Sequence, residues 1–509
     1  MRKKKLSLFL FCILFIFCGC NKGQKDSPLL TRAPMTTSAA QTVSAEDFSH
    51  IEKHVVWYHD GQFTYGRDPR IFTEFNNLLL ERGYDFVVDF VTEPSLSEEE
   101  YYAYQQKLRT CKEQGQQVDL IFTGWAMVEG ETTYDSAIRD ELLLPLDEFF
   151  AESEEGKKLY EVFPAHVWEM MERDGKVYGV CENGWYGNYY SAVLNKTMLE
   201  KYEVEAPGEF SLEGYFQTIR QVYEKAKAEG EELFPLYLTA DAVYSYLGYY
   251  KAGDFWVKQT EDGRVAFVNP YEDGEAKKLF ALLEEYHEAF GGYGTTDEYR
   301  NSLRANVQIA SFQPTLMHCS CSNKNIDYPA YTYEPQQIYY AMPIHNAVHG
   351  VASWATYPEE AKTLLTLIST DEEFINLLYY GIEDVNYRLE DGLAVLLNEK
   401  KREAPGFEAR VNELFVYSRF SEPLNKRELL QEHQQKVVFL PLEVEELQKE
   451  PLSEEEAAVA ALFRKAEGLW LGEYENAGEV AEQICEELKA AKVEEVLQKR
   501  TERIYRKEE

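Results

Sequence analysis

Short apolar runs alternate with amphipathic segments through the first part of the chain's body. The runs are rich in β-branched and aromatic residues, which favours strands, and the run 118–125 is apolar nearly throughout, as expected for a parallel strand covered on both faces. Between the first two runs, Ile71, Phe75 and Leu79 recur at helical spacing. The predicted order is strand 54–58, helix 69–82, strand 84–93, helix 101–117 and strand 118–125. Strands that alternate with helices in this way predict a doubly wound α/β sheet.

The later part of the chain continues with strands and helices. Asp174-Gly175 predicts a tight turn, and Ser211 is well placed to cap the N-terminus of an amphipathic helix. From about Asp371 the pattern is mostly helical. Further strands are predicted at 176–181, 189–194, 307–314 and 337–343, and the closing segment 479–507 is predicted to be helical. A chain of 509 residues is long enough for two or more domains.

The first 47 residues differ from the body. Arg2–Lys5 is basic, and the apolar run 6–17 that follows is too short to span a membrane but fits a signal peptide. The sequence Phe17-Cys18-Gly19-Cys20 is similar to the lipobox of bacterial lipoproteins, in which the cysteine matching Cys20 is acylated. An uncleaved signal anchor is the alternative. Residues 21–47 are rich in Ser, Thr, Ala, Gln and Pro, and we expect a flexible tether with a mean reach of about 30 Å.

The formal net charge of −37 changes the choice of partners. With 89 acidic and 52 basic residues, the chain repels phosphate backbones, so nucleic acid is not expected as a partner. The chain also holds 36 Tyr and 7 Trp. These side chains combine a flat apolar face with a polar group, which suits sugar rings, although tyrosines can equally fill a large hydrated surface.

The cysteines and histidines of the body offer only weak metal candidates. The five body cysteines are odd in number and irregularly spaced, so a disulfide framework is not expected. Cys319 and Cys321 lie beside His318 and suggest a metal site, but cysteines on a buried strand are commoner. His345 and His349 have helical metal-pair spacing in a strand-like context. We therefore predict neither a metal nor a cofactor.

Four stretches together resemble the extracellular solute-binding lipoproteins of bacterial ABC transporters, of the carbohydrate-binding, family 1-like type. They are the lipobox, the strand VDLIFTGW, the segment 174–202 beginning DGKVYGV, and the segment 357–387, which contains YYGIEDVNY. The last third is similar to a subgroup with an extra C-terminal helical region. Cys181 stands where the family commonly has proline, which leaves the ligand contacts near the hinge open.

The resemblance implies a two-lobed, type II periplasmic-binding-protein-like α/β fold, with doubly wound sheets joined by a hinge. The predicted parts are a signal peptide 1–20, a tether 21–47, a first lobe of 48–182 plus about 344–373, and a second lobe of 183–343 plus about 374–509. It also implies a monomer that is lipid-anchored on the extracellular side of the cell membrane, binds a small-molecule solute, and docks on permease subunits.

Ligands of open α/β folds bind at loops outside the carboxyl ends of parallel strands, and in this family they bind between the lobes. These positions supply aromatic faces for sugar rings and carboxylates or amides for hydroxyl groups. The predicted ligand-binding residues are Asp60, Gln62, Trp125, Asn183, Trp185, Tyr186, Asn188, Asp241, Tyr244, Tyr246, Gln313, Trp354 and Glu383.

Other functions remain open from the residues alone. A peptide or another polar solute is an alternative ligand. A surface glycosidase would need two carboxylates in an aromatic cleft, and the abundance of acids says nothing about their geometry. The body contains no GxSxG, HExxH, P-loop or GxGxxG motif, so we predict a binding protein and not an enzyme. A surface adhesin is a further alternative.

Overall fold

The structure is a computed structural model of the whole chain. It describes residues 41–43, 48–60, 68–93, 98–124, 127–128, 131–181, 183–184, 186, 190–292, 298, 301–302, 305–314, 330–333, 338–341, 348–397, 412–418 and 424–506. Cys20 and most of the predicted tether lie outside these residues. The described residues build two separate hydrophobic cores, each around its own sheet.

The first sheet has the strand order β1-β3-β2-β4-β18-β9. Its centre is parallel, because β2 pairs in parallel with both β3 and β4, whereas β18 runs antiparallel to β4. The strands are β1 Gln41–Val43, β2 Lys53–Asp60, β3 Phe86–Glu93, β4 Leu120–Phe122, β9 Val180–Cys181 and β18 Val348–Val351. The predicted alternation of strands and helices is therefore confirmed for this part of the chain.

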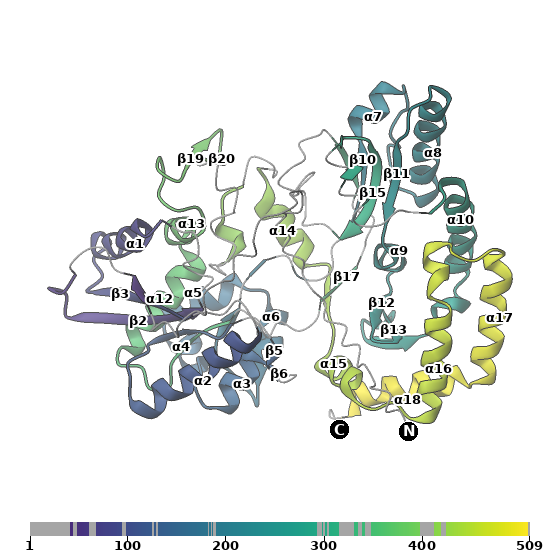
Figure 1. Cartoon of the computed structure of the whole chain (residues 1–509). Helices are drawn as coiled ribbons and strands as arrows, with labels where there is room; N and C mark the ends of the chain where they lie inside the picture. Colours follow the sequence, from purple (N-terminus) through teal and green to yellow (C-terminus); the bar gives the residue numbers. More distant parts are fainter. Residues whose placement is uncertain are drawn as a thin grey trace, which may run out of the picture. The chain divides into compact units, whose positions relative to one another are not determined.

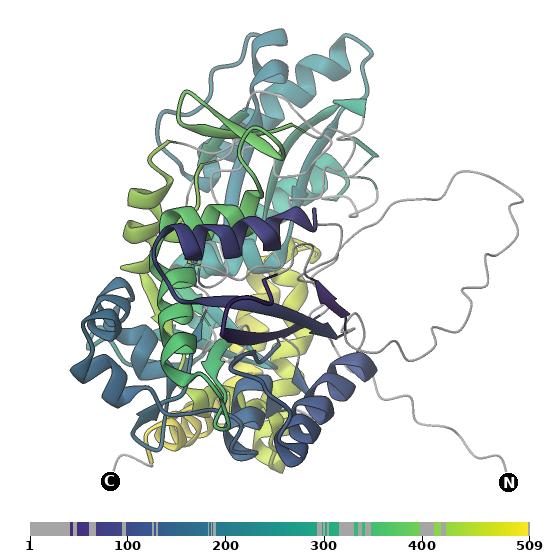
Figure 2. The ribbon, with the colours of Figure 1, turned by 90° about the vertical axis from the view of Figure 1, so that its left-hand side faces the viewer.

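Helices cover both faces of this sheet, and α1 lies across β2 and β3 (Figure 2). The helices of this lobe are α1 Arg70–Glu81, α2 Glu98–Gln114, α3 Thr133–Arg139, α4 Asp147–Glu152, α5 Glu154–Val162, α6 Ala165–Met171, α12 Pro358–Thr370 and α13 Glu372–Tyr380. Asp174 and Gly175 both have positive φ angles and form the predicted turn between β7 Glu172–Arg173 and β8 Lys176–Val177. The helices of this lobe and its sheet bury one set of apolar residues, which we name the first core. In the sequence its members run from Val55 to Val416.

The second sheet has the order β11-β15-β10-β16, with β11 parallel to β15 and the other pairs antiparallel. Ser211 caps α8 as predicted, since its hydroxyl accepts from the backbone N–H of Gly214 at 3.1 Å. The elements are β10 Tyr190–Asn195, α7 Lys196–Lys201, α8 Leu212–Ala228, β11 Phe234–Leu238, α9 Ala240–Tyr246, α10 Gly274–Phe290, β15 Gln308–Pro314 and β16 Ala330–Tyr333. A three-stranded sheet of β12 Tyr250–Ala252, β13 Phe255–Gln259 and β14 Val265–Val268 adjoins them.

The C-terminal helices belong to this second core. They are α15 Leu442–Lys449, α16 Glu454–Lys465, α17 Ala477–Ala490 and α18 Val493–Ile504, and they pack beside α10 and the β12–β14 sheet (Figure 1). The predicted helical segment 479–507 is thus two helices, separated at Lys492, which has a φ of 58°. Arg500 of α18 lies buried against Phe255 and bonds Glu456 of α16 at 2.6 Å.

A short parallel ribbon connects the cores. It consists of β17 Tyr339–Ala341 and β21 Val437–Phe439. Tyr340 lies in the second core and Ala341 in the first, while Phe439 packs against the first and Leu440 lies in the second. Successive side chains of a strand point to opposite faces, so this ribbon is shared by both cores.

Two boundaries differ from the prediction. The sequence assigns residues from about 374 to the second lobe, but α13 and the strands β19 Tyr387–Glu390 and β20 Leu393–Leu396 pack in the first core. The final return to the second core lies near Leu440. The tether prediction is wrong at 41–43, because β1 pairs with β3 at the sheet edge, where backbone bonds need no apolar pattern.

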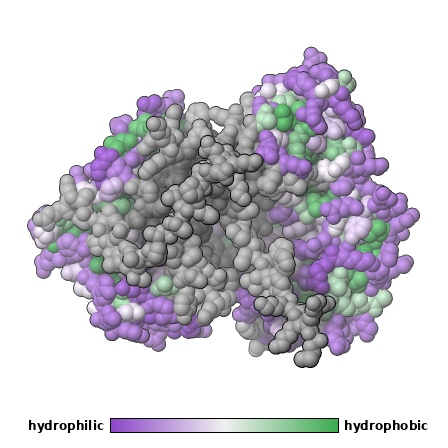
Figure 3. Space-filling view, in the orientation of Figure 1, coloured by the Kyte–Doolittle hydropathy of each residue, from purple (hydrophilic) through white to green (hydrophobic). Residues whose placement is uncertain are grey.

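Polar side chains dominate the described part of the face that Figure 3 shows. Figure 3 shows mostly hydrophilic residues on the visible described face, with smaller hydrophobic areas between them. This agrees with the formal net charge of −37. No helix within the described ranges is long and apolar enough to cross a membrane.

Candidate ligand-binding site

The carboxyl ends of β2, β3 and β4 meet at one edge of the first sheet, because these strands are parallel. Asp60 ends β2 there, and its side chain is only 2% exposed. Its Oδ1 lies 3.1 Å from Nδ1 of His59. Glu93 ends β3 and accepts a hydrogen bond of 2.8 Å from the hydroxyl of Tyr58. The structure therefore places Asp60 at the predicted edge.

Two histidines that were not predicted as ligand residues lie behind this edge. The His59 ring stacks on Phe122 with centroids 4.1 Å apart, and it lies 5.6 Å from the His349 ring of β18. Burial, with the neighbouring His59 as a second cause, holds the pKa of His349 well below its usual range. His349 is therefore neutral at physiological pH. The sequence did offer a signal for His59. This histidine directly precedes Asp60 at the end of an apolar strand.

The segment that leads to Trp125 is held by side chains from neighbouring helices. The Gln105 amide donates to the Thr123 carbonyl at 2.7 Å, and the Thr133 hydroxyl donates to the Gly124 carbonyl at 2.9 Å. Gly124 has a φ of 89°, a left-handed conformation that favours glycine. The backbone is thus fixed up to Gly124, and Trp125 itself lies outside the described residues.

The second sheet presents a comparable edge. The parallel strands β11 and β15 end close together, with Leu238 opposite Phe312, so Asp241 and the backbone of Gln313 follow at the same edge. The Tyr190 hydroxyl, at the start of β10, donates to Oδ2 of Asp241 at 3.0 Å. Burial, followed by the nearby Asp241, raises the pKa of Tyr190 and keeps that hydroxyl protonated. A carboxylate can accept several bonds, so Asp241 retains capacity for a ligand hydroxyl.

Asn183 and Tyr186 lie in the crossing from the first to the second core, and both are buried. The Asn183 side-chain oxygen accepts from the Tyr186 hydroxyl at 3.0 Å and from the Gln434 amide at 2.7 Å. The Gln434 amide also donates to the Gly184 carbonyl at 3.0 Å. Gln434 belongs to α14 Lys426–Gln434, so these bonds tie two crossing segments together. We name this cluster the crossing joint.

The predicted residues Tyr244 and Tyr246 lie on α9, the helix that begins at the edge with Asp241. Tyr244 packs against Trp256, with ring centroids 4.9 Å apart, and Tyr246 packs against Phe210 at 5.8 Å. The structure therefore uses both tyrosines in core contacts of the second lobe.

Trp354 lies at the opposite end of the first sheet. β18 runs antiparallel to β4 and its last residue, Val351, pairs with Leu120 at the beginning of β4. The Trp354 indole N–H donates to the Gln116 carbonyl, before β4, at 2.8 Å. Trp354 was predicted at the edge where the parallel strands end, but it lies at the edge where β4 begins.

Glu383 is exposed in a turn after α13. Gly381, with a φ of 91°, opens this turn, and the Asn386 side chain accepts from the backbone N–H of Ile382 at 2.8 Å. The Asn386 amide also donates to Asp68 at 3.5 Å. Asp68 lies just before α1, so the turn that holds Glu383 lies near the N-terminal end of that helix.

Several predictions lie outside the described residues. They concern Gln62, Trp185 and Asn188 as ligand contacts, Cys20 as the lipidation site, and His318, Cys319, Cys321 and His345 as weak metal candidates. Cys111, Cys181 and Cys485 are buried thiols. In the part of the chain that the structure describes, no three histidine, cysteine or carboxylate side chains are grouped to hold a metal ion.

Comparison of the fold with solved structures finds solute-binding proteins. The chain is similar to the N-glycan transport solute binding protein (NgtS) from Streptococcus pneumoniae, with 16% identity over 89% of this chain and 98% of that chain and a TM-score of 0.60. A structure of the same protein in complex with Man1GlcNAc gives 15% identity over 89% and 99%, with a TM-score of 0.51. An extracellular solute-binding protein from Bifidobacterium longum subsp. infantis gives 12% identity over 89% and 98%, with a TM-score of 0.54.

These similarities confirm the predicted fold class, a periplasmic-binding-protein-like α/β fold. No protein-family model and no curated protein matches the sequence. At this level of identity the likeness concerns the fold, and ligand contacts must be argued from this chain's own residues.

Proposed function

We propose that this chain is the substrate-binding component of an ABC importer. It captures an extracellular solute, a sugar or oligosaccharide, between its two lobes and delivers it to permease subunits in the membrane. The proposal is carried by one observation: in each lobe a carboxylate lies at the carboxyl end of a parallel strand, Asp60 as the last residue of β2 and Asp241 just after β11, at the start of α9. The similarity in fold to an N-glycan transport solute binding protein supports the same ligand class.

In this proposal the ligand is bound without covalent chemistry. Asp60, Asp241 and Gln313 supply hydrogen-bond acceptors and donors for hydroxyl groups, and Trp125 and Trp185 supply aromatic faces. In a site shielded from water, each unpaired polar group costs about 1–3 kcal/mol, which gives selectivity for the arrangement of hydroxyls. Ligand shifts the lobes toward a closed form because it contacts both of them only in that form. The permease then recognises the closed form.

The proposed location is the extracellular face of the cell membrane, with a monomer held through acylated Cys20. Without the residues that pair in β1, the proposed tether is 21–40, and a flexible chain of this length has a mean reach of about 25 Å. This length keeps the lobes near the permease.

Thermal unfolding with candidate ligands tests the proposal. A ligand that binds only the native state stabilises it by about 2.7 kcal/mol at 100 times its Kd. Man1GlcNAc, maltose and N,N′-diacetylchitobiose are expected to raise the Tm if they match the site, and a peptide mixture and single amino acids form the comparison arm. Stabilisation by peptides and by no sugar would transfer the importer role to peptide transport.

Asp241→Asn locates the site. The loss of a charged acceptor costs about 1.5–3 kcal/mol, so this variant should bind the stabilising sugar about 10- to 100-fold more weakly. Asp262→Asn is the matched control, because Asp262 is exposed in the turn between β13 and β14. Equal affinity in the two variants would remove Asp241 from the site.

A further inference from the structure

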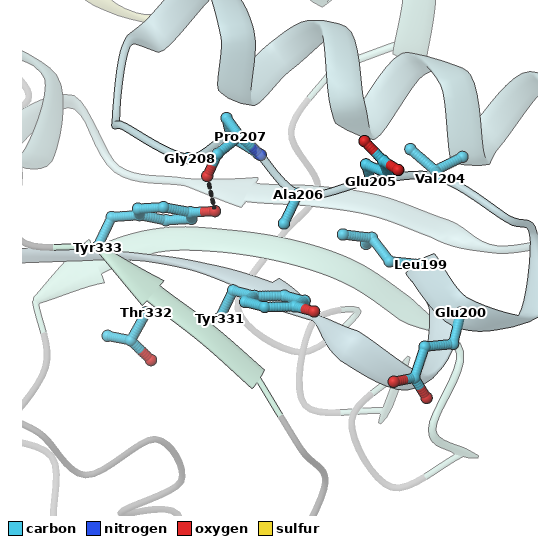
Figure 4. A pocket seen from close by; sticks show the side chains of 10 residues that line it. All are labelled: Leu199, Glu200, Val204, Glu205, Ala206, Pro207, Gly208, Tyr331, Thr332 and Tyr333. Carbon is cyan, nitrogen blue, oxygen red and sulfur yellow. Dashed lines mark hydrogen bonds between the residues drawn. The ribbon is translucent and has the colours of Figure 1, made fainter.

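The second lobe contains a pocket beside β16, the edge strand of its four-stranded sheet. Its volume is about 540 Å³, within the range of about 300–1,000 Å³ that is usual for small-molecule sites. The main lining side chains are Leu199, Glu200, Glu205, Pro207, Tyr331 and Tyr333. They come from three places in the chain: α7, the segment after it, and β16 (Figure 4).

This pocket is distinct from the ligand site proposed above. Strand β10 begins at Tyr190, which bonds Asp241, and ends at Asn195, which pairs with Ala330 of β16. Because α7 follows directly after Asn195, the pocket lies toward the end of β10 that is opposite to Tyr190. The pocket therefore lies on the Asn195 side of β10 at Tyr331, which pairs with Leu194, and reaches the middle of the strand at Tyr333, which pairs with Ala192.

Two tyrosines give the pocket a fixed aromatic surface. Tyr331 and Tyr333 are two residues apart on β16 and point to the same side, whereas Thr332 points away (Figure 4). The Tyr333 hydroxyl donates to the Pro207 carbonyl at 2.8 Å, and its ring lies 5.7 Å from that of Phe210. These contacts hold the Tyr333 ring in place before any ligand arrives. Tyr331 remains 38% exposed, which is unusual for a large apolar side chain of this protein.

Charged groups around the rings select the class of ligand. Glu200 and Glu205 are exposed carboxylates in the lining, and they repel an anionic ligand. The protein supplies its own cation at this place, because Nζ of Lys196 lies 5.8 Å from the Tyr331 ring centroid and 3.7 Å from a carboxylate oxygen of Glu200. A cationic ligand would therefore have to compete with Lys196. Flat aromatic faces beside carboxylate acceptors suit a neutral ring that carries both C–H faces and hydroxyl groups.

We propose that this pocket is a second carbohydrate site, which binds one or two neutral pyranose rings against Tyr331 while Glu200 and Glu205 accept bonds from their hydroxyls. The inference goes beyond the proposed importer function, and it does not depend on closure of the lobes. Because the pocket is open to solvent, we expect millimolar affinity, far weaker than that of the site at Asp241.

Saturation-transfer NMR on the full chain tests the proposal with maltose and N,N′-diacetylchitobiose as neutral probes, glucose 6-phosphate as an anionic probe and choline as a cationic probe. The measurement is made in an Asp241→Asn background, which weakens the other site. We expect saturation transfer to a neutral disaccharide, with about five- to tenfold weaker binding in Tyr331→Ala, the loss that corresponds to one aromatic face. Tyr331→Phe should retain the binding, because its ring face is unchanged.

Tyr160→Ala is the matched control, since Tyr160 is 42% exposed but lies on α5 in the first lobe. The proposal is overturned if Tyr331→Ala binds the neutral probes as well as Tyr160→Ala does. It is also overturned if only choline or only glucose 6-phosphate depends on Tyr331. An absence of sugar-induced stabilisation in the unmodified protein, with saturation transfer still dependent on Tyr331, would contradict the proposed import of sugars and leave this proposal standing.

Discussion

Replacement of Gln434 by alanine is expected to weaken the crossing joint. The Gln434 side chain is only 3% exposed, and its amide donates to the Asn183 side chain at 2.7 Å and to the Gly184 carbonyl at 3.0 Å. Alanine removes both donors and leaves two buried acceptors without them. The bonds connect α14 to the first crossing, so the loss is felt in two segments that are far apart in the sequence.

The magnitude follows from the number and burial of these bonds. An acceptor left without its donor costs about 1–3 kcal/mol, and Asn183 keeps the hydroxyl of Tyr186, which puts its share at the low end. We therefore expect the free energy of unfolding to fall by about 2–4 kcal/mol. In a double-mutant cycle with Asn183→Ala, the coupling energy should be about 1 kcal/mol or more.

Urea unfolding followed by tryptophan fluorescence and circular dichroism measures this change. The midpoint of Gln434→Ala should fall while the m-value stays constant, which indicates lost stability without a change in the surface exposed on unfolding. Gln435→Ala is the control, because the adjacent Gln435 is exposed and of the same residue type. If the two variants had the same midpoint, the reasoning about the crossing joint would be refuted.

Two further predictions concern stability, one for a residue of the second lobe, Arg500, and one for a residue of the first, His349. Arg500 is 2% exposed and bonds Glu456, so Arg500→Met should lower the free energy of unfolding by about 3–5 kcal/mol in thermal unfolding, whereas its exposed neighbour Lys499, changed to Ala, should have little effect. The lowered pKa of His349 means that only the unfolded chain takes up its proton, so the contribution of this group to stability should be constant above about pH 6.5, and below it stability should fall by up to about 1.4 kcal/mol per pH unit. Urea midpoints measured across this range should fall less steeply in His349→Phe, while His166, whose pKa burial also lowers, keeps part of the slope; an equal slope in both proteins would contradict the assignment.

The sheet edges were predictable from the sequence. Asp60 and Asp241 each follow an apolar strand, and the rule that ligands gather at the carboxyl ends of parallel strands needs only the strand assignment. The direction of a strand within its sheet was not predictable from the pattern. β18 pairs antiparallel to β4, and this alone moves Trp354 to the opposite end of the sheet.

The contacts of Tyr244 and the lobe boundary predicted near residue 374 show a second limit of sequence patterns. An amphipathic helix shows that it has an apolar face, but not which core covers that face. Phe374 of α13 packs 4.9 Å from Phe75 of α1, so the helix belongs to the first core, although it follows the predicted crossing. In the same way the half-buried Tyr244 packs against Trp256 and against Trp470 from the C-terminal region, a contact that no local pattern indicates.

The shared ribbon restricts how the two lobes can move in the proposed mechanism. Tyr340 is fixed in the second core, because its hydroxyl accepts from the Gln259 backbone N–H at 2.7 Å and donates to the Gly248 carbonyl at 2.9 Å. Phe439, on the paired strand, packs at the first core, 5.4 Å from Tyr186. Sliding of one lobe along the ribbon would withdraw one of these rings from its core and expose a large apolar surface. Bending of the ribbon keeps Tyr340 buried and Phe439 packed against Tyr186, so a hinge is the motion that this connection permits at low cost.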